Sequence, residues 1–308
     1  MNIYTLTLNP AYDVHGTTQN LKPYRENFAA VTSREAGGKG INISRALNET
    51  GLANTAIVVL GSRNGAEFKA LLAESNINAL FITQDGYIRE NLTLHEDDGK
   101  ETRISFAGFC VADSLPEQIL PLIEGSEDTI LTFTGSIPTG LTMERVKAFL
   151  KKLQAQGIRI VIDCRSFTVE DILELQPWLI KPNQEEVSGY FGCSVDTLPA
   201  AAEKAKYFHA RGMANAVVSM GSQGMVMACS SGIYTAAVPQ LDVISTIGAG
   251  DSAIAGFLAA AARDEDPAEC LRSAAAFGSA ACLTQGTLPP RKADILRIKE
   301  QIVITKLT

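Results

Sequence analysis

The sequence predicts an α/β protein with a mostly parallel central sheet, helices on both faces of that sheet, and a small inserted β lid. Three observations support this prediction. Short β-rich runs alternate with helix-length amphipathic segments through most of the chain, which is typical of parallel sheets covered by helices. Two segments break the alternation. No linker rich in Pro, Gly or Ser marks an independent second domain.

Strands are expected where β-branched and other apolar residues form short runs. These runs cover residues 2–9, 54–61, 79–83, 128–135, 158–163, 178–183 and 215–221. Helical patterns lie between several of them, at residues 65–75, 142–157 and 199–212. Strands that alternate with helices of this length favour βαβ units.

The two segments that break the alternation are expected to form the lid. Residues 10–35 are polar and have no helical period. Residues 88–108 predict a β-hairpin that turns at Asp98 and Gly99, because an Asp-Gly pair is a strong hairpin signal.

The C-terminal part is strongly helical and alanine-rich. This pattern runs from Gly250 to Gln285, with a short break at residues 264–267. We therefore expect a single domain over residues 1–308, with a lid formed by about 10–35 and 87–109.

Composition and charge exclude several classes of function. The chain has 308 residues, a net charge of -7 and a pI near 5.1, whereas broad binding to nucleic acid or anionic membranes needs a basic surface. The six cysteines form no Cys-x-x-Cys pair and the three histidines are scattered, so neither a disulfide framework nor a histidine metal site is expected. The N-terminus lacks a signal-peptide pattern and no apolar run approaches about 20 residues, so a cytoplasmic location is expected.

A glycine-rich turn precedes a helix near the N-terminus. It contains Gly37, Gly38, Lys39 and Gly40, and Asn42 lies on the first turn of the helix. The spacing differs from that of a Walker A loop. A flexible turn is the simplest interpretation, but a lysine among three glycines also offers a cation and backbone donors to an oxygen-rich ligand.

A second glycine motif opens an alanine-rich helix near the C-terminus. Gly248, Ala249, Gly250 and Asp251 precede a long apolar run. The first turn of a helix leaves backbone N–H groups unpaired and carries a partial positive charge, so it attracts anions. Asp251 alone could be a helix cap. Two glycines around an alanine exceed what a cap requires, because each glycine costs backbone entropy.

Two further turns follow predicted strands. Residues 219–224 form a glycine turn at the place where open parallel sheets bind ligands, although a plain β-turn would have the same composition. Asn183 and Glu186 lie on one side of a helix start, where their oxygens suit either a water-coordinated magnesium ion or simple capping.

Together these motifs resemble the ribokinase-like (PfkB-type) carbohydrate kinases, and the similarity covers essentially the whole chain. The two diagnostic motifs are "GGKGINISRAL" at residues 37–47 and "TIGAGDSAIAGFL" at residues 246–258. "TLNPAYD" at residues 7–13 and Lys39 in the glycine turn look like the phosphosugar branch of the family. The resemblance implies a ribokinase-like three-layer α/β sandwich. It also implies a phosphotransferase that uses ATP and Mg²⁺ to phosphorylate a sugar phosphate.

The resemblance assigns roles to individual residues. Asp251 would be the general base, and the amides of Ala249 and Gly250, preceded by Gly248, would form an anion hole for the γ-phosphoryl group. The substrate side would comprise Asp13, Gly37, Gly38, Lys39, Asn42, Arg89 and Asn91, with Lys39 and Arg89 holding the phosphate of the acceptor. The nucleotide side would comprise Asn183, Ser219, Gly221, Ser222, Gly224 and Gly278, with Glu186 and Asn183 at the metal.

The resemblance implies fructose 1-phosphate as the leading acceptor. The alternative activities are those of a tagatose-6-phosphate kinase or a 6-phosphofructokinase. Three departures from the family pattern, at residues 105–109, 163–167 and 245–246, concern the choice of sugar. Lids of this type often pair between subunits, which implies a homodimer, although apolar lid residues could instead cover their own active site.

Two other classes of function compete with the kinase. One is a catalytically silent sugar-phosphate-binding protein, and retention of Asp251 with its glycine turn favours catalysis over it. The other is a dinucleotide-binding oxidoreductase. This class is disfavoured, because no Gly-x-Gly-x-x-Gly motif opens a helix after the first strand.

Overall fold

Strands and helices alternate along most of the chain. The computed structural model describes residues 1–307. The strands of the central sheet are β1 (Asn2–Thr7), β4 (Thr55–Gly61), β5 (Ala79–Gln84), β8 (Thr129–Thr134), β9 (Arg159–Asp163), β10 (Leu179–Ile180), β11 (Asn215–Ser219), β12 (Met225–Cys229), β13 (Gly232–Ala237) and β14 (Val303–Leu307).

The helices connect these strands. They are α1 (Lys39–Asn48), α2 (Gly65–Ala73), α3 (Leu115–Ile119), α4 (Met143–Gln154), α5 (Val169–Leu175), α6 (Gln184–Phe191), α7 (Leu198–His209), α8 (Ala249–Ala261), α9 (Pro267–Ala281) and α10 (Lys292–Lys299), with 3₁₀ turns η1 (Leu120–Leu122) and η2 (Gly221–Gln223). Across residues 1–307, no helix combines the length and apolar character that a membrane crossing requires.

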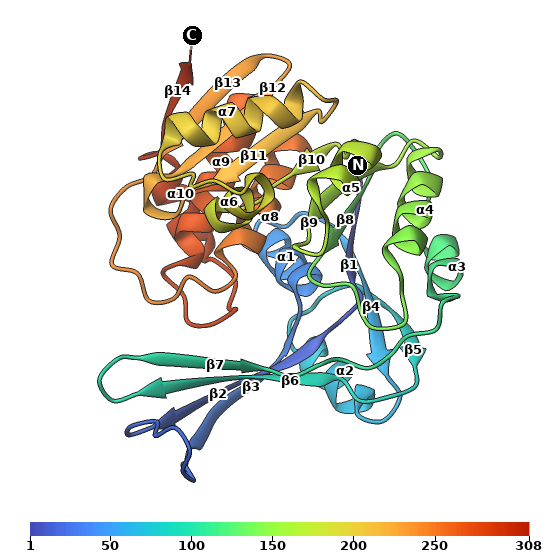
Figure 1. Cartoon of the computed structure of the whole chain (residues 1–308), viewed down its shortest axis with the longest axis vertical. Coiled ribbons are helices and arrows are strands. Elements are labelled where there is room, and N and C mark those ends of the chain that lie inside the picture. The colour runs from blue at the N-terminus through green and yellow to red at the C-terminus, as the bar shows by residue number, and fades with distance from the viewer. Residues whose placement is uncertain (308) are drawn as a thin grey trace.

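The central sheet has ten strands within the described residues, in the order β14-β13-β12-β11-β10-β9-β8-β1-β4-β5 (Figure 1). Neighbouring strands from β11 to β5 in this order pair in parallel. The strands β11 to β14 pair antiparallel at the other edge. The predicted α/β class with a mostly parallel sheet is confirmed.

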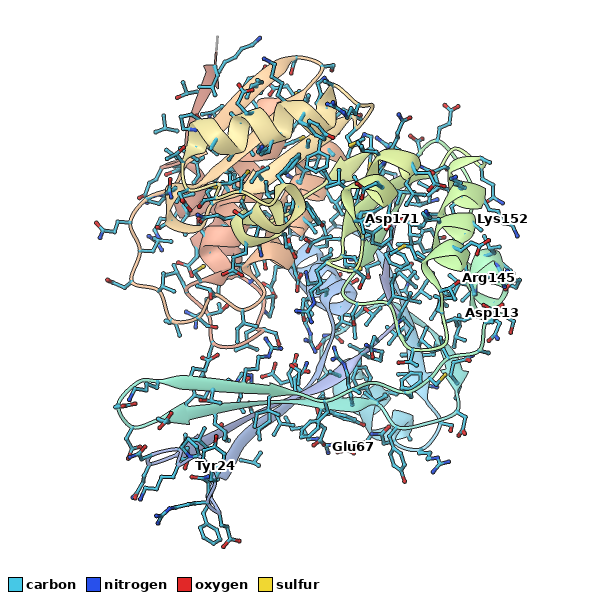
Figure 2. The ribbon with its side chains drawn as sticks, in the orientation of Figure 1. Tyr24, Glu67, Asp113, Arg145, Lys152 and Asp171 are labelled. Carbon is cyan, nitrogen blue, oxygen red and sulfur yellow. The ribbon has the colours of Figure 1, made fainter. Side chains whose placement is uncertain are left out.

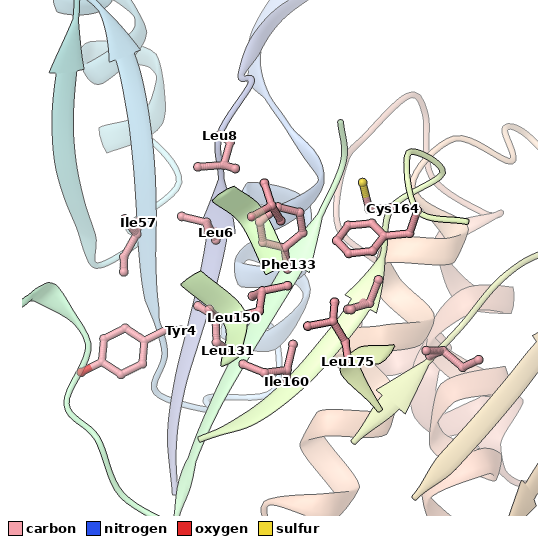
Figure 3. Close-up of a cluster of buried hydrophobic side chains, with 14 of the residues drawn as sticks. Tyr4, Leu6, Leu8, Ile57, Leu131, Phe133, Leu150, Ile160, Cys164 and Leu175 are labelled. Atoms are coloured by element: carbon pink, nitrogen blue, oxygen red, sulfur yellow. The ribbon is translucent and has the colours of Figure 1, made fainter. Parts of the chain in front are cut away.

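Alternate residues of the central strands pack on opposite faces of the sheet. In β1, Ile3 joins a cluster that includes side chains of α1, α8, α9 and α10. Tyr4 and Leu6 join another cluster with side chains of α2, α4, α5, α6 and α7. Figure 3 shows part of this second cluster, where Leu150 of α4 lies over Leu131 of β8. Two helical layers therefore enclose the sheet, as the predicted three-layer sandwich requires.

A second, smaller sheet has the order β3-β2-β6-β7. Its strands are β2 (Ala11–Thr18), β3 (Ala30–Gly37), β6 (Arg89–Glu96) and β7 (Glu101–Ser105). β2 pairs antiparallel with β3 and parallel with β6, and β6 pairs antiparallel with β7. Figure 1 shows this sheet below the main body, and Figure 2 shows Tyr24 at its outer end. It therefore forms a separate wall that faces the central sheet.

The predicted strands and helices agree with the structure within a few residues, with one informative difference. The predicted strand at residues 178–183 shrinks to β10, because Pro182 follows it and cannot donate a backbone hydrogen bond. The polar segment 10–35 contains the strand β2 and most of β3, which is the β structure expected of it. The hairpin prediction is confirmed, and the Gly99 amide donates to the Glu96 carbonyl at 2.9 Å in its turn.

Gly256 is a point where α8 lies directly against α9. A side-chain carbon at this position would lie 2.4 Å from the carbonyl oxygen of Ser273 and 2.8 Å from the ring of Phe277. We expect Gly256→Ala to lower the free energy of unfolding by about 1–3 kcal/mol, the usual cost of overpacking. Urea denaturation measures this change.

Gly189→Ala is the matched control for this prediction. Gly189 lies inside α6, and a carbon added there meets nothing within 4 Å. Alanine costs less conformational entropy than glycine in a helix, so this variant should gain about 0.5–1 kcal/mol. Equal stability of the two variants would contradict the close packing of α8 on α9.

Candidate active site

A cleft of about 1430 Å³ lies at the carboxyl ends of the parallel strands, between the main body and the small sheet. Ligands of open α/β sheets usually bind at this edge. Of the predicted site residues, only Gly37 does not line the cleft. The others do so: Asp13, Gly38, Lys39, Asn42, Arg89, Asn91, Asn183, Glu186, Ser219, Gly221, Ser222, Gly224, Gly248, Ala249, Gly250, Asp251 and Gly278.

Asp251 lies in the first turn of α8 but does not cap it. The N-cap is Gly248, whose φ of 78° suits glycine and which makes no side-chain capping bond. Asp251 is 5% exposed, and one of its carboxylate oxygens accepts a hydrogen bond from Asn42 Nδ2 at 2.9 Å. Burial raises the pKa of Asp251 to about 6, although the nearby Lys39 opposes the shift. The capping-only interpretation is therefore wrong.

The free amides at the start of α8 differ from those that the family resemblance assigned. The Ala249 amide donates to the Thr246 carbonyl at 3.3 Å. Within residues 1–307, the amides of Gly250 and Asp251 make no hydrogen bond. An anion at this helix start would therefore meet Gly250 and Asp251 rather than Ala249 and Gly250.

An ion cluster around the buried carboxylate of Asp163 adjoins Asp251. Asp163 at the end of β9 accepts from Lys39 Nζ at 2.9 Å, and its other oxygen lies 3.5 Å from Lys181 Nζ. Burial opposes ionisation of Asp163, but the two lysines hold its pKa below the ordinary value. A carbon added to Gly250 would lie 3.3 Å from Lys181 Nζ, so this ammonium group lies against the start of α8.

Lys39 and Arg89 occupy different electrostatic environments. The carboxylates that raise the pKa of Lys39 are Asp163, Asp251 and Glu186, whereas burial lowers it. Lys39 therefore belongs with the carboxylates around Asp251. Its predicted pairing with Arg89 at a single phosphate stays a prediction, since both residues line the cleft.

Asp13 and Asn91 present polar groups from the small sheet. Asn91 Nδ2 donates to Asp13 Oδ1 at 2.8 Å. Gly37 lies behind this carboxylate, because a carbon added there would be 1.9 Å from Asp13 Oδ2. Gly37 therefore leaves room for Asp13 instead of lining the cleft itself. The carbonyl oxygens of the Asn42 and Asn91 side chains are buried and lack a hydrogen-bond partner among residues 1–307.

Arg89 adds an incompletely paired cation to the same wall. Its Nη1 donates to the Phe106 carbonyl at 3.2 Å, and its buried Nε has no partner within the described chain. Burial lowers the pKa of Arg89, Asp13 raises it, and the charges of Arg103 and Arg165 lower it further. Arg89 is therefore surrounded by one carboxylate, Asp13, and two further guanidinium groups, those of Arg103 and Arg165.

The turn after β11 and the start of α6 form the opposite end of the cleft. Asn183 in the loop before α6 pairs with Ser219 in an isolated parallel bridge. Asn183 Oδ1 accepts from the Glu186 amide at 2.8 Å, and Glu186 Oε2 accepts from the Asn183 amide at 2.9 Å. The capping interpretation of this pair is therefore correct.

The capping box still leaves a carboxylate oxygen for a cation. Glu186 lines the cleft, and its Oε1 takes no part in the box. No group of three or more His, Cys, Asp or Glu side chains within residues 1–307 could hold a metal ion. Mg²⁺ needs only one or two protein carboxylates when phosphates and water complete its shell. The residues present therefore fit Mg²⁺ bound together with a phosphate ligand.

Five charged residues of this cleft were not predicted from the sequence: Arg103, Asp163, Arg165, Lys181 and Glu185. Three of them carried a weak signal. Asp163 ends a predicted strand and Arg165 follows it, both within the departure at residues 163–167, and Lys181 lies in the predicted strand 178–183. No sequence signal distinguishes Arg103 from an ordinary exposed strand residue.

Known proteins match this chain over nearly its full length. The pfkB family carbohydrate kinase pattern matches residues 7–294. The 1-phosphofructokinase of Escherichia coli (strain K12) is 31% identical over 91% of this chain and 90% of that protein. The ATP-dependent 6-phosphofructokinase isozyme 2 of the same strain is 31% identical over 93% of this chain and 94% of that protein.

A solved structure is also similar to this chain over nearly its full length. The phosphofructokinase-2 from Escherichia coli in complex with substrates and products is 30% identical and superposes with a TM-score of 0.91, over 98% of this chain and 99% of that one. The resemblance in sequence and the ribokinase-like fold are thereby confirmed. This chain belongs to the pfkB family of carbohydrate kinases, which transfer a phosphoryl group to a sugar hydroxyl.

Proposed function

We propose that this protein transfers the γ-phosphoryl group of ATP to a hydroxyl of a ketohexose phosphate, and that fructose 1-phosphate is the acceptor. The observation that supports this most directly is the buried Asp251 beside two free helix amides and two lysines. A coupled ADP-release assay over fructose 1-phosphate, fructose 6-phosphate, tagatose 6-phosphate, fructose and ribose tests the proposal. Turnover of none of the ketohexose phosphates would overturn it.

In the proposed reaction, Asp251 removes the proton of the acceptor hydroxyl. The hydroxyl oxygen bonds to the γ-phosphorus while the bond from that phosphorus to the bridging oxygen breaks, which releases ADP. The amides of Gly250 and Asp251 and the ammonium groups of Lys39 and Lys181 stabilise the charge on the transferring group. Mg²⁺ near Glu186 would neutralise nucleotide phosphate charge.

The proposed acceptor lies against the small sheet. Asp13 and the free side-chain oxygens of Asn42 and Asn91 are suited to sugar hydroxyls, because each can accept a hydrogen bond. Arg89 and Arg103 are suited to the phosphate of the acceptor, since guanidinium groups bind phosphate in a bidentate manner. We place ATP toward Asn183, Ser219, Gly221, Ser222, Gly224 and Gly278, and we expect the enzyme to work in the cytoplasm.

Asp251→Asn is expected to lower kcat by roughly 10²–10⁴-fold, because the amide cannot accept the proton. The KM for ATP should change little, since only the transition state loses an interaction. In the parent enzyme, kcat/KM for the acceptor should fall about tenfold per pH unit below pH 6, because a base with a pKa of about 6 is then protonated.

Thermal stability separates this catalytic role from a structural one. The folded-state pKa of Asp251 is raised, so its stabilising contribution is complete below the unfolded pKa near 4 and is lost as the pH rises through about 6. Asn cannot ionise, so the Tm of Asp251→Asn at pH 8 should not fall below that of the parent. Near-normal kcat in this variant would refute the assignment of the base.

Arg89→Ala is expected to reduce the preference for phosphorylated acceptors. The parent should show a far higher kcat/KM for the ketohexose phosphate than for free fructose. Loss of a charge-assisted hydrogen bond should reduce that advantage by about 1.5–3 kcal/mol in the variant. Kinetics with both acceptors and both enzymes measure it. If the parent turned over free fructose equally well, the phosphosugar assignment would fail and Asp251 would retain its role.

We further propose that two copies pair through the face of the small sheet that points away from Asp13. Register places Val31 and Ile104 on that face, 67% and 43% exposed. Covering them would remove apolar area from water. Sedimentation should give a dimer for the parent and a monomer for Ile104→Asp, with Leu296→Asp on the distant helix α10 as the control. A monomeric parent at micromolar concentration would rule the dimer out.

A further inference from the structure

The cleft contains more positive charge around Asp13 than Asp13 can neutralise. Three arginines line the cleft: Arg89, Arg103 and Arg165. Within residues 1–307 they make a single ion pair, in which Arg103 Nη2 lies 3.7 Å from Asp13 Oδ1. Arg89 forms a single hydrogen bond to a backbone carbonyl and has a buried Nε without a partner. The side chain of Arg165 makes neither a hydrogen bond nor an ion pair with any described residue. A local excess of positive charge suits an anionic ligand. The excess is confined to this cleft, since the whole chain carries a net charge of -7.

Arg165 lies on a different wall of the cleft from Arg89 and Arg103. Arg89 and Arg103 belong to β6 and β7 of the small sheet, whereas Arg165 follows β9 of the central sheet. All three line the same cleft. Arg165 is nevertheless near enough to Arg89 for its charge to lower the pKa of Arg89, after the larger effect of burial. Cations therefore face each other from the two walls of the cleft.

No nearby carboxylate forms an ion pair with Arg165. It also borders a side pocket of about 400 Å³, whose lining includes Glu170 and Glu186. Neither carboxylate lies within ion-pair distance of Arg165, and Glu186 is engaged in the capping box. Asp163, two residues earlier, binds Lys39 and Lys181 through its two oxygens. The guanidinium of Arg165 is thus available to a ligand in the cleft.

We propose that Arg165 is a specificity-determining residue that binds the phosphate of the acceptor from the main-body wall, opposite Arg89 and Arg103. This inference rests on the proposed function. A phosphate dianion offers three oxygens, which is enough for guanidinium groups from both walls. Binding of a phosphorylated acceptor then holds the small sheet against the main body, whereas a free sugar brings no anion to Arg89 and Arg165.

Kinetics of Arg165→Gln test this role. The substitution removes the charge but keeps an exposed side chain polar and unbranched, so the Tm should stay at the parent value. The KM for the ketohexose phosphate should rise about 10- to 100-fold, the equivalent of one charge-assisted hydrogen bond. The KM for ATP should stay within twofold, and inorganic phosphate should inhibit the variant at correspondingly higher concentrations. Arg165→Lys, which retains a cation, should recover part of the loss.

Arg63→Gln is the matched control. Arg63 is also exposed and cationic, but it is paired with Asp85 at 3.6 Å and does not line the cleft. This variant removes the same charge from the molecule and should leave both KM values unchanged. An unchanged acceptor KM in Arg165→Gln, or an increase confined to the KM for ATP, would overturn the inference.

Direct binding separates failure of this inference from failure of the proposed function. Calorimetry with fructose 1-phosphate needs no turnover. If the parent bound the sugar phosphate but did not phosphorylate it, the proposed function would fail. A weaker affinity of Arg165→Gln in the same experiment would still support the role of Arg165. Equal affinity of the two proteins would refute that role even in an active kinase.

Discussion

The active site depends on one buried carboxylate, Asp163, and the two lysines that neutralise it. An isolated charge in the interior is costly, and removal of one partner of a buried ion pair leaves the other uncompensated. Asp163 is the last residue of β9, Lys181 follows β10, and Lys39 begins α1. The neutralisation of one carboxylate therefore fixes three separate segments of the chain around the start of α8. Asp251 lies beside them with a pKa raised by burial to about 6.

The two walls of the cleft differ in their balance of positive and negative side chains. On the main body, carboxylates and lysines balance each other, so a proton acceptor and an anion site can lie within one turn of helix. On the small sheet, the guanidinium groups of Arg89 and Arg103 outnumber the single carboxylate of Asp13. A cleft lined by charge of one sign raises the local concentration of ligands of the opposite sign. The excess of arginine over carboxylate on this wall therefore favours an anionic acceptor over a neutral one.

Sequence patterns predicted the layers of the fold and the two glycine motifs, because both depend on local chemistry. Short apolar runs between helical segments identified most of the parallel strands. The two glycines around Ala249 indicated an anion site. Asp163 and Lys181 were missed because each is a single charged residue after an ordinary strand. Their importance comes from the pairing of β9 with β10, and strand order is not encoded in any short motif. The hydrogen bond from the Ala249 amide to the Thr246 carbonyl could not be predicted for a similar reason, since it depends on the geometry of the turn.

The departures from the family pattern gain a physical meaning from their positions. Ser105 and Arg165, from two of these segments, line opposite walls of the cleft, and both lie outside the ion cluster around Asp163. Substitution at these positions changes the shape and charge that an acceptor meets, but it does not disturb the contacts that hold Asp251 and the start of α8. The residues proposed for acceptor recognition and those of the ion cluster around Asp163 are therefore separate sets. Under this arrangement a family with one transfer site can recognise different sugar phosphates, because the recognition residues carry little of the stability of the fold.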